Sequence, residues 1–306
     1  MSYVPSTNKD YLRRIQYTEG ALGTDNVFLN VGFTSRFNST LTNDREVIRE
    51  LGFEDIGYDL KLGEVITAEL GWRAVEPSMI KYCMALCAST GTPANPINIL
   101  ENCRINNASK FFVTEGLKPT RLSLTYARML ELSANFVGLN QGDAIDEEDL
   151  ETLVGADPGL VQYAGNITTA PWSNLSGGTT TPVTIDSGSG FTAYPNISFS
   201  MDVGRAIATN QPSGNATPTH IDVTNREITG NWTTILKDDP FYTAVKNGQA
   251  LTMKIRLKSG GTPCDLTLND LVFNSYPRVS DAGSTTHRQI TFGYQAKTAS
   301  ISAYVP

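Results

Sequence analysis

Apolar and polar side chains alternate residue by residue along several stretches of this 306-residue chain. In 250–258, apolar residues at every second position alternate with Lys254, Arg256 and Lys258. The run 121–137 has the same pattern over a greater length. Successive side chains of a β-strand point to opposite faces, so each run predicts a strand with one buried face and one polar face. The chain is therefore expected to be mainly β.

The remaining segments extend this prediction along the chain. Strands are expected at 27–37, 57–72 (two strands joined around Lys61, Leu62 and Gly63), 110–113, 121–137 (one strand, or two that break near Ala127 and Arg128), 196–203, 221–224, 226–236, 250–258, 265–273 and 288–294, with a last strand or an arm at 297–306. Short helices are expected at 43–51 (with a solvated loop as the alternative), 78–88, 147–154 and 240–246.

A similar order of signals occurs twice, at 66–86 and at 227–257. Each stretch has Ile-Thr followed by a small residue, then a tryptophan, then an acid-Pro pair, then a short helical run. The tryptophans are Trp72 and Trp232, and the pairs are Glu76-Pro77 and Asp239-Pro240. This order predicts two related β-rich units, read as β-sandwich or half-barrel units that each carry a short helix.

The predicted organisation has four parts. Residues 1–24 form an N-terminal arm that packs on its own body or on a neighbour. Residues 25–138 form the first β-rich half, and 196–306 form the second half with a C-terminal arm. Between them, 139–195 is first acidic and then rich in Gly, Ser and Thr, which is typical of a linker or an insertion.

Composition narrows the class of protein. Charged residues make up 18% of the chain and the net charge is −7. A general nucleic-acid binder needs a clustered basic surface that releases counterions, so this balance argues against one. The first residues have no apolar core typical of a secretory signal, and no apolar run approaches the length of a membrane span, so a soluble protein is expected.

Cysteine and histidine residues do not form a metal-binding pattern. Cys83 and Cys87 share one helix face, whereas Cys103 and Cys264 lie far from them in sequence. The four cysteines are therefore interpreted as buried free thiols. The two histidines lie in turn-rich segments without a neighbouring acid or cysteine, and are interpreted as surface residues: they are His220 and His287.

No motif for catalysis is present in the sequence. The glycine pairs at 177–178 and 260–261 do not fit a phosphate-binding loop, and the run 186–190 is a flexible turn rather than a nucleophile elbow. The acids of 146–151 fit a solvated face. Trp72 and Trp232 are interpreted as core residues rather than as stacking platforms. We therefore predict no enzyme, no cofactor, and no catalytic, cofactor-binding or metal-binding residues.

Four segments resemble tail tube proteins of tailed bacterial or archaeal viruses, in their larger variety of about this length. They are the arm with Tyr17-Thr18-Glu19-Gly20 and Gly23-Thr24, the alternating run 121–138, the strand–helix–strand order 228–257, and the closing alternation at 265–279 and 288–296. The resemblance covers most of the chain except 140–195.

The resemblance implies a structural virion protein located in the viral tail. Its copies would form homohexameric rings, each subunit giving strands to an inner β-barrel. The rings would stack into a tube that contacts other tail proteins and conducts genome DNA without binding it. The alternative functions are a β-sandwich baseplate, distal tail or adhesin module, and a β-rich hydrolase.

One prediction concerns the basic row Lys254, Arg256 and Lys258. A row of cations is a poor lining for a DNA conduit, because phosphates would bind to it. These side chains are therefore expected to point away from a lumen or to pair with acids of a neighbouring subunit.

Overall fold

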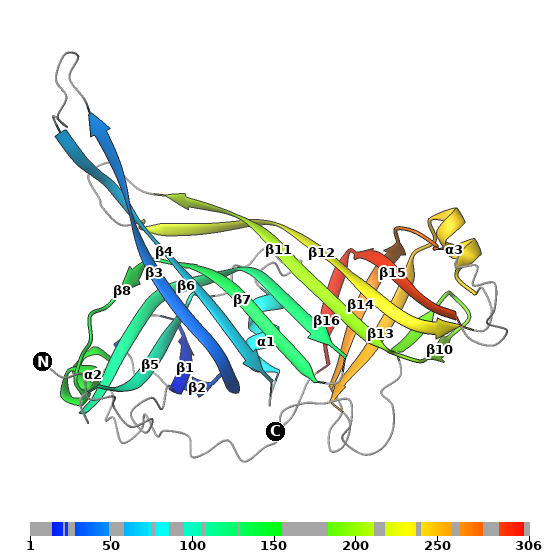
Figure 1. Ribbon diagram of the computed structural model, residues 1–306, viewed down its shortest axis with the longest axis horizontal. Coiled ribbons are helices and arrows are strands. Elements are labelled where there is room, and N and C mark those ends of the chain that lie inside the picture. The colour runs from blue at the N-terminus through cyan, green and yellow to red at the C-terminus, as the bar shows by residue number, and fades with distance from the viewer. Residues whose placement is uncertain are drawn as a thin grey trace, which may run out of the picture.

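The computed structural model describes residues 14–20, 22–23, 28–48, 58–74, 77–85, 95–105, 108–127, 129–154, 183–210, 218–236, 240–258, 264–277 and 288–302. These residues are mainly β-structure, as predicted, with three short helices (Figure 1). The strands are β1 (Arg14–Glu19), β2 (Leu29–Asn30), β3 (Phe33–Ile48), β4 (Tyr58–Arg73), β5 (Ile97–Ile105), β6 (Ala108–Tyr126), β7 (Leu130–Gly138), β8 (Asn140–Gln141), β9 (Val183–Asp186), β10 (Phe191–Tyr194), β11 (Ser198–Asn210), β12 (His220–Leu236), β13 (Leu251–Lys258), β14 (Cys264–Phe273), β15 (Arg288–Ala296) and β16 (Thr298–Ile301). The helices are α1 (Ser78–Ala85), α2 (Glu147–Val154) and α3 (Tyr242–Asn247). None of the described helices has the length and apolar character needed to cross a membrane.

The strands form one open antiparallel sheet whose middle part we call the central sheet. Its strand order is β3–β4–β7–β6–β11–β12–β15–β14, where β6 contributes its second half and β14 only its last residues. The first half of β6 continues into a side layer with β5, β1, β2 and β8. The first part of β14 continues in the same way into a second side layer with β13, β9, β10 and β16.

One face of the central sheet forms the main hydrophobic core. Its fully buried large side chains include Trp72, Phe136, Phe199, Trp232 and Phe292. Helices α1 and α3 contribute to the same core through residues such as Met79 and Ala244. Because the residues between these positions face the other way, the alternation seen in sequence becomes a core on one face and a polar surface on the opposite face.

The pairing scheme of β1–β8 occurs again in β9–β16, so we call these the first and second units. In each unit the first strand pairs with the second and the fifth, the third with the fourth, the fourth with the seventh, and the sixth with the fifth, seventh and eighth. The helix follows the fourth strand in both, as α1 and α3. Ala68 lies opposite Phe136 as Gly230 lies opposite Tyr294, at the same point of the scheme. Trp72 and Trp232 lie two residues apart in it, so the correspondence of the tryptophans in sequence is not exact in the structure.

A shared irregularity supports this equivalence in detail. The β5–β6 register shifts between Ile97 and Ile99, and the β13–β14 register shifts between Leu251 and Met253. The residues that accommodate the shift have positive φ in both units, Gly116 at 67° and Asp270 at 50°. Backbone hydrogen bonds beside the shift also match, from Leu139 N to Glu115 O at 3.0 Å and from Lys297 N to Asn269 O at 3.2 Å.

The two bulge positions predict opposite effects of substitution. Gly116→Ala should lower the free energy of unfolding by about 2–4 kcal/mol, because the left-handed region is costly for alanine and the added Cβ would lie 2.7 Å from the Leu139 side chain. Asp270→Gly should raise it by up to about 1 kcal/mol, since glycine adopts this φ without strain. Urea unfolding followed by circular dichroism measures both. A loss in Asp270→Gly as large as that in Gly116→Ala would contradict the proposed equivalence.

Several predicted strands are longer and more continuous than the sequence indicated. The predicted helix at 43–51 is wrong over its described part, since β3 runs through to Ile48. The predicted break at 61–63 is also wrong, because β4 passes through it with only a register shift. These two segments pair with each other, and a cross-strand ladder outweighs weak local propensity. The expected strands at 221–224 and 226–236 are likewise one strand, β12.

The other elements agree more closely with the pattern. The run 121–137 divides into β6 and β7 near Ala127, one of the two predicted alternatives. The helices α1 and α2 are confirmed, and α3 begins two residues later than predicted and ends at Gly248, whose φ of 60° closes the helix. Residues 86–88 of the first predicted helix lie outside the described residues.

The predicted arm and linker both contain strands. Residues 14–19 of the expected arm form β1, which packs on its own body with Ile15 and Tyr17 buried. The expected linker 139–195 contains β8, α2, β9 and β10, and β9 lies between β10 and β13 in the second side layer. Residues 1–13, 21 and 24 of the arm and 155–182 of the linker lie outside the described part of the chain.

Candidate functional surface

The polar face of the central sheet extends across all eight of its strands. A single cross-strand row passes through all eight strands of the sheet. That row is Arg36, Gly71, Ser133, Ser123, Asp202, Thr229, Gln295 and Val272. The neighbouring rows are similarly polar and include Asn38, Thr67, Glu69, Arg73, Arg121, Thr125, Glu131, Asn135, Ser200, Glu227, Asn231, Thr291 and Asn274. The face is therefore continuous, polar and rich in hydroxyl and amide groups.

The arginines of this face are paired with acids on adjacent strands. Arg73 contacts Glu131 at 3.0 Å and Arg36 contacts Glu69. These pairs are exposed, so each adds little to stability. The pairs matter more for phosphate binding than for stability, because a guanidinium paired with a carboxylate has fewer free donors for a phosphate.

A third pair lies where the two units meet. Arg121 on β6 donates to the Asp202 carboxylate on β11 from both Nε (3.1 Å) and Nη2 (2.8 Å). Ser123 Oγ donates to the same carboxylate. This junction is therefore held by backbone pairing and by a charge-assisted cluster on the polar face.

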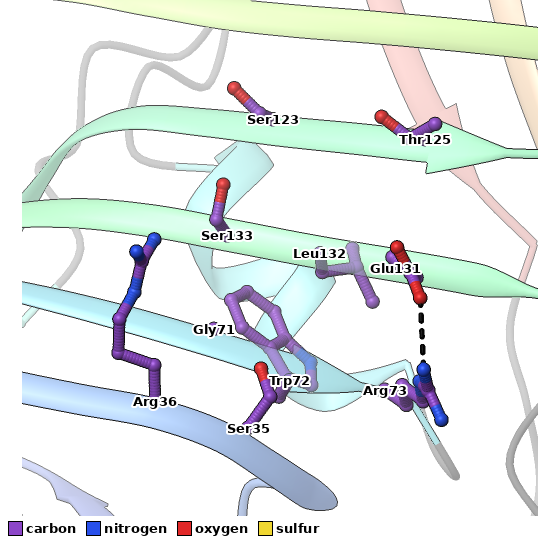
Figure 2. Close-up of a pocket in the computed structure, with 10 residues that line it drawn as sticks. All are labelled: Ser35, Arg36, Gly71, Trp72, Arg73, Ser123, Thr125, Glu131, Leu132 and Ser133. Carbon is purple, nitrogen blue, oxygen red and sulfur yellow. Dashed lines mark hydrogen bonds and ion pairs between the residues drawn. The ribbon is translucent and has the colours of Figure 1, made fainter.

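A depression of about 520 Å³ lies on the polar face of the first unit (Figure 2). Its rim carries the Arg73–Glu131 pair and small hydroxyl residues, and the edge of Trp72 lies at its base. The hydroxyls Ser123, Ser133 and Thr125 have no histidine among the lining residues to act as a general base. Within the described ranges, no group of three His, Cys, Asp or Glu side chains could hold a metal ion.

The sequence-predicted candidates occupy structural positions. Trp72 and Trp232 are 1% and 0% exposed, so their interpretation as core residues is confirmed. Cys83 and Cys264 are buried free thiols, as predicted, and burial raises their pKa values to about 12 and about 11. Cys103 is also free but only half-buried.

Other candidates are only partly described. Cys87, His287 and the glycine pairs at 177–178 and 260–261 lie outside the described residues, as does the side chain of His220. The turn at 186–190 joins β9 and β10, and the Asp186 carboxylate accepts hydrogen bonds from the backbone of Gly188 (2.7 Å) and Gly190 (2.9 Å). The acids of 147–151 lie on α2, whose Leu150 is buried.

The basic row of β13 interacts within its own chain. Arg256 forms a two-pronged pair with Asp265 on the adjacent strand β14, at 2.9 and 3.3 Å. The Lys254 ammonium lies 4.1 Å from the centre of the Phe191 ring. The strand belongs to a side layer and not to the central sheet. The expected partner acid is therefore intramolecular for Arg256, while the expectation that the row avoids a lumen stays a prediction.

No protein-family model matches the chain, and no curated protein matches it. The functional argument therefore depends on the polar face and on the two ends of the central sheet. Within the described residues, β3 pairs only with β4, and the end of β14 pairs only with β15. Sequence reasoning did not identify these edges, because an edge is defined by what a strand lacks beside it.

Proposed function

We propose that the protein is a structural subunit of a tubular assembly, in which central sheets of neighbouring copies join into a ring-shaped β-barrel. The observation that carries this proposal is the open central sheet, with a polar face across eight strands. Within the central sheet, the strand at each end has an outer edge that pairs with no other strand among the described residues. Open strand edges are liabilities in a free protein, and closure into a barrel removes them. No catalytic role is proposed.

The tube that best fits this description is the tail tube of a tailed virus, the family that the sequence resembles. Its polar face would line a water-filled channel through which genome DNA passes. The arginines Arg36, Arg73 and Arg121 are paired with acids, so the lining would offer phosphates few free cations. The net charge of −7 adds a weak repulsion of DNA.

Two hairpin ribbons offer contacts between stacked rings. In the first ribbon, 41–48 of β3 and 58–65 of β4 pair only with each other among the described residues. The second ribbon consists of the end of β11 and the start of β12. Both extend beyond the rest of the central sheet on the same side (Figure 1). A two-stranded ribbon is marginally stable in water, so a second ring that covers Val65, which is 36% exposed, would stabilise it.

Electron microscopy of the purified full-length chain tests this function. At rising protein concentration we expect rings with a central pore, followed by short stacks of rings along one axis. A Val65→Asp variant should form rings but fewer stacks, because desolvating a charge at the ribbon disfavours stacking. Protein that stays monomeric at high concentration, with and without other tail components, would contradict the proposal.

A further inference from the structure

The junction between the two units is a strand pair with a defined register. It joins the sixth strand of the first unit, β6, to the third strand of the second unit, β11. Ser123 lies opposite Asp202, and Leu122 lies opposite Val203. Polar members of the junction face the polar surface, and apolar members lie in the core.

The second ribbon is anchored to the first unit beside this junction. The Lys118 ammonium on β6 donates to the Ile221 carbonyl at 2.6 Å, and the Arg226 guanidinium donates to the Met84 carbonyl at the end of α1 at 3.1 Å. Ile221 is 1% exposed. The first ribbon has no such cover in the described structure, which is consistent with the exposure of Leu41.

The two open edges of the central sheet are the missing halves of a second such junction. The edge strand β3 is the third strand of the first unit, and β14 is the sixth strand of the second unit. The pairing of β14 with β15 reaches Asn274, whose backbone N–H donates to Gly293 O at 2.8 Å. The two end strands of the central sheet are therefore the equivalents of β11 and β6, the two strands that pair with each other in its middle.

We propose that the end of β14 pairs with β3 of the next copy in the register of the β6–β11 junction, and that three copies close the ring. This inference rests on the proposed function and specifies its subunit contact. The equivalences between the units place 274–277 of one copy antiparallel to 39–42 of the next. Asn274 then lies opposite the next copy's Thr42, where Arg121 and Gly204 meet inside the chain.

The chemistry of the proposed contact matches its position in the sheet. Thr42 and Asn274 are both exposed, and the hydroxyl and the amide can hydrogen-bond to each other on the polar face. Leu41 and Phe273 lie on the opposite face, where Leu41, which is 40% exposed, extends the core from one copy to the next. The contact is head-to-tail, so it generates either a closed ring or an open filament.

The number of copies follows from the width of the closed barrel. Each chain supplies two units, with eight strands of the central sheet. Eight strands from each of three copies give a barrel about 45–50 Å across between backbones, at usual strand spacing and tilt. Two copies would give about 32 Å, comparable with porin-sized barrels, and six would give about 95 Å. Three copies leave room for a duplex while keeping the wall near it.

Paired cysteines test the register. Thr42→Cys combined with Asn274→Cys should form covalent links between copies on oxidation, and in parallel with a short bis-maleimide. Both reagents are needed because opposed Cβ atoms about 4.5–5.5 Å apart are near the upper limit for a disulfide. On a denaturing non-reducing gel, we expect a ladder of dimer and trimer that stops at three copies.

Three controls accompany the experiment. Arg121→Cys with Gly204→Cys should cross-link within one chain, because this pair occupies the corresponding place in the internal junction. Thr42→Cys with Thr291→Cys should not cross-link between copies, since Thr291 lies inside the central sheet opposite Thr233. The unmodified protein reports any link through its own cysteines.

The possible outcomes distinguish a failure of the proposed contact from a failure of the proposed function. A ladder that stops at three, with three-fold symmetry in end-on images of unmodified rings, supports the proposal. Rings without cross-links would overturn the register while the tube function stands. A ladder that continues to six or beyond would overturn three-copy closure. The absence of both rings and cross-links, in folded variants and in the unmodified protein, would overturn the tube function as well.

Discussion

Trp232→Ala is expected to lower the free energy of unfolding by about 5 kcal/mol or more, the largest effect of any single side-chain truncation in the chain. The indole is fully buried and lies within 6.2 Å, between ring centroids, of four aromatic rings. Those rings belong to Tyr194, Phe241, Phe273 and Phe292. Loss of the indole removes these contacts and leaves a cavity that packed strands cannot refill.

Two variants control this measurement. Trp232→Phe should lower the free energy of unfolding by much less than Trp232→Ala. The indole Nε1 has no hydrogen-bond partner among the described residues, and the variant retains an aromatic ring. Trp72→Ala should lose about 1–2 kcal/mol less than Trp232→Ala, since the residue opposite Trp72 is Leu132 where Trp232 has Phe292. Urea unfolding by circular dichroism, below the concentration at which rings form, measures all three. An equal or greater loss in Trp72→Ala would contradict this account of the aromatic core.

Gly230→Ala is expected to lower the free energy of unfolding by more than about 3 kcal/mol, although it adds only one carbon. The new Cβ would lie 2.1 Å from the backbone oxygen of Ser200 and 2.4 Å from the hydroxyl of Tyr294. That hydroxyl is buried and donates to the same Ser200 oxygen at 2.8 Å. The alanine would therefore separate β12 from β11 and break this hydrogen bond.

Gly204→Ala is the matched control, because a Cβ at Gly204 on β11 meets no atom within 4 Å. Its effect should stay within about 1 kcal/mol, as for surface substitutions. Introduced into a Tyr294→Ala background, Gly230→Ala should still lower the free energy of unfolding, but by less than in the unmodified chain, since the Ser200 backbone oxygen remains in place. No loss in that background would show that the side chain, and not the backbone, sets the limit.

The same comparison applies to the first unit. At the positions equivalent to Gly230 and Tyr294, it has Ala68 and Phe136. In both units a small residue on the fourth strand faces a large aromatic residue on the seventh strand. Packing requires the combined volume of facing residues to fit, and this order satisfies it in both cores.

The polar face was partly predictable from sequence. Alternation in 121–137 and 250–258 indicated which side chains share a face of each strand, and the buried residues of β6, β7 and β13 confirm that. Alternation does not indicate which strands lie side by side. The polar row that continues from Arg36 to Val272 could not be predicted, and neither could the assignment of β13 to a side layer.

The sequence by itself determined the β-class of the chain, the faces of its best strands, the sites of α1 and α2, and the closure of α3 at Gly248. These features depend on side-chain period and on local backbone preference, which neighbouring residues specify. Only the tertiary structure decided that β3 continues through to Ile48, that Gly116 and Asp270 are equivalent, and that the sheet ends at β3 and β14. Those features depend on hydrogen bonds between strands far apart in the chain, and a short window of sequence does not contain the partner.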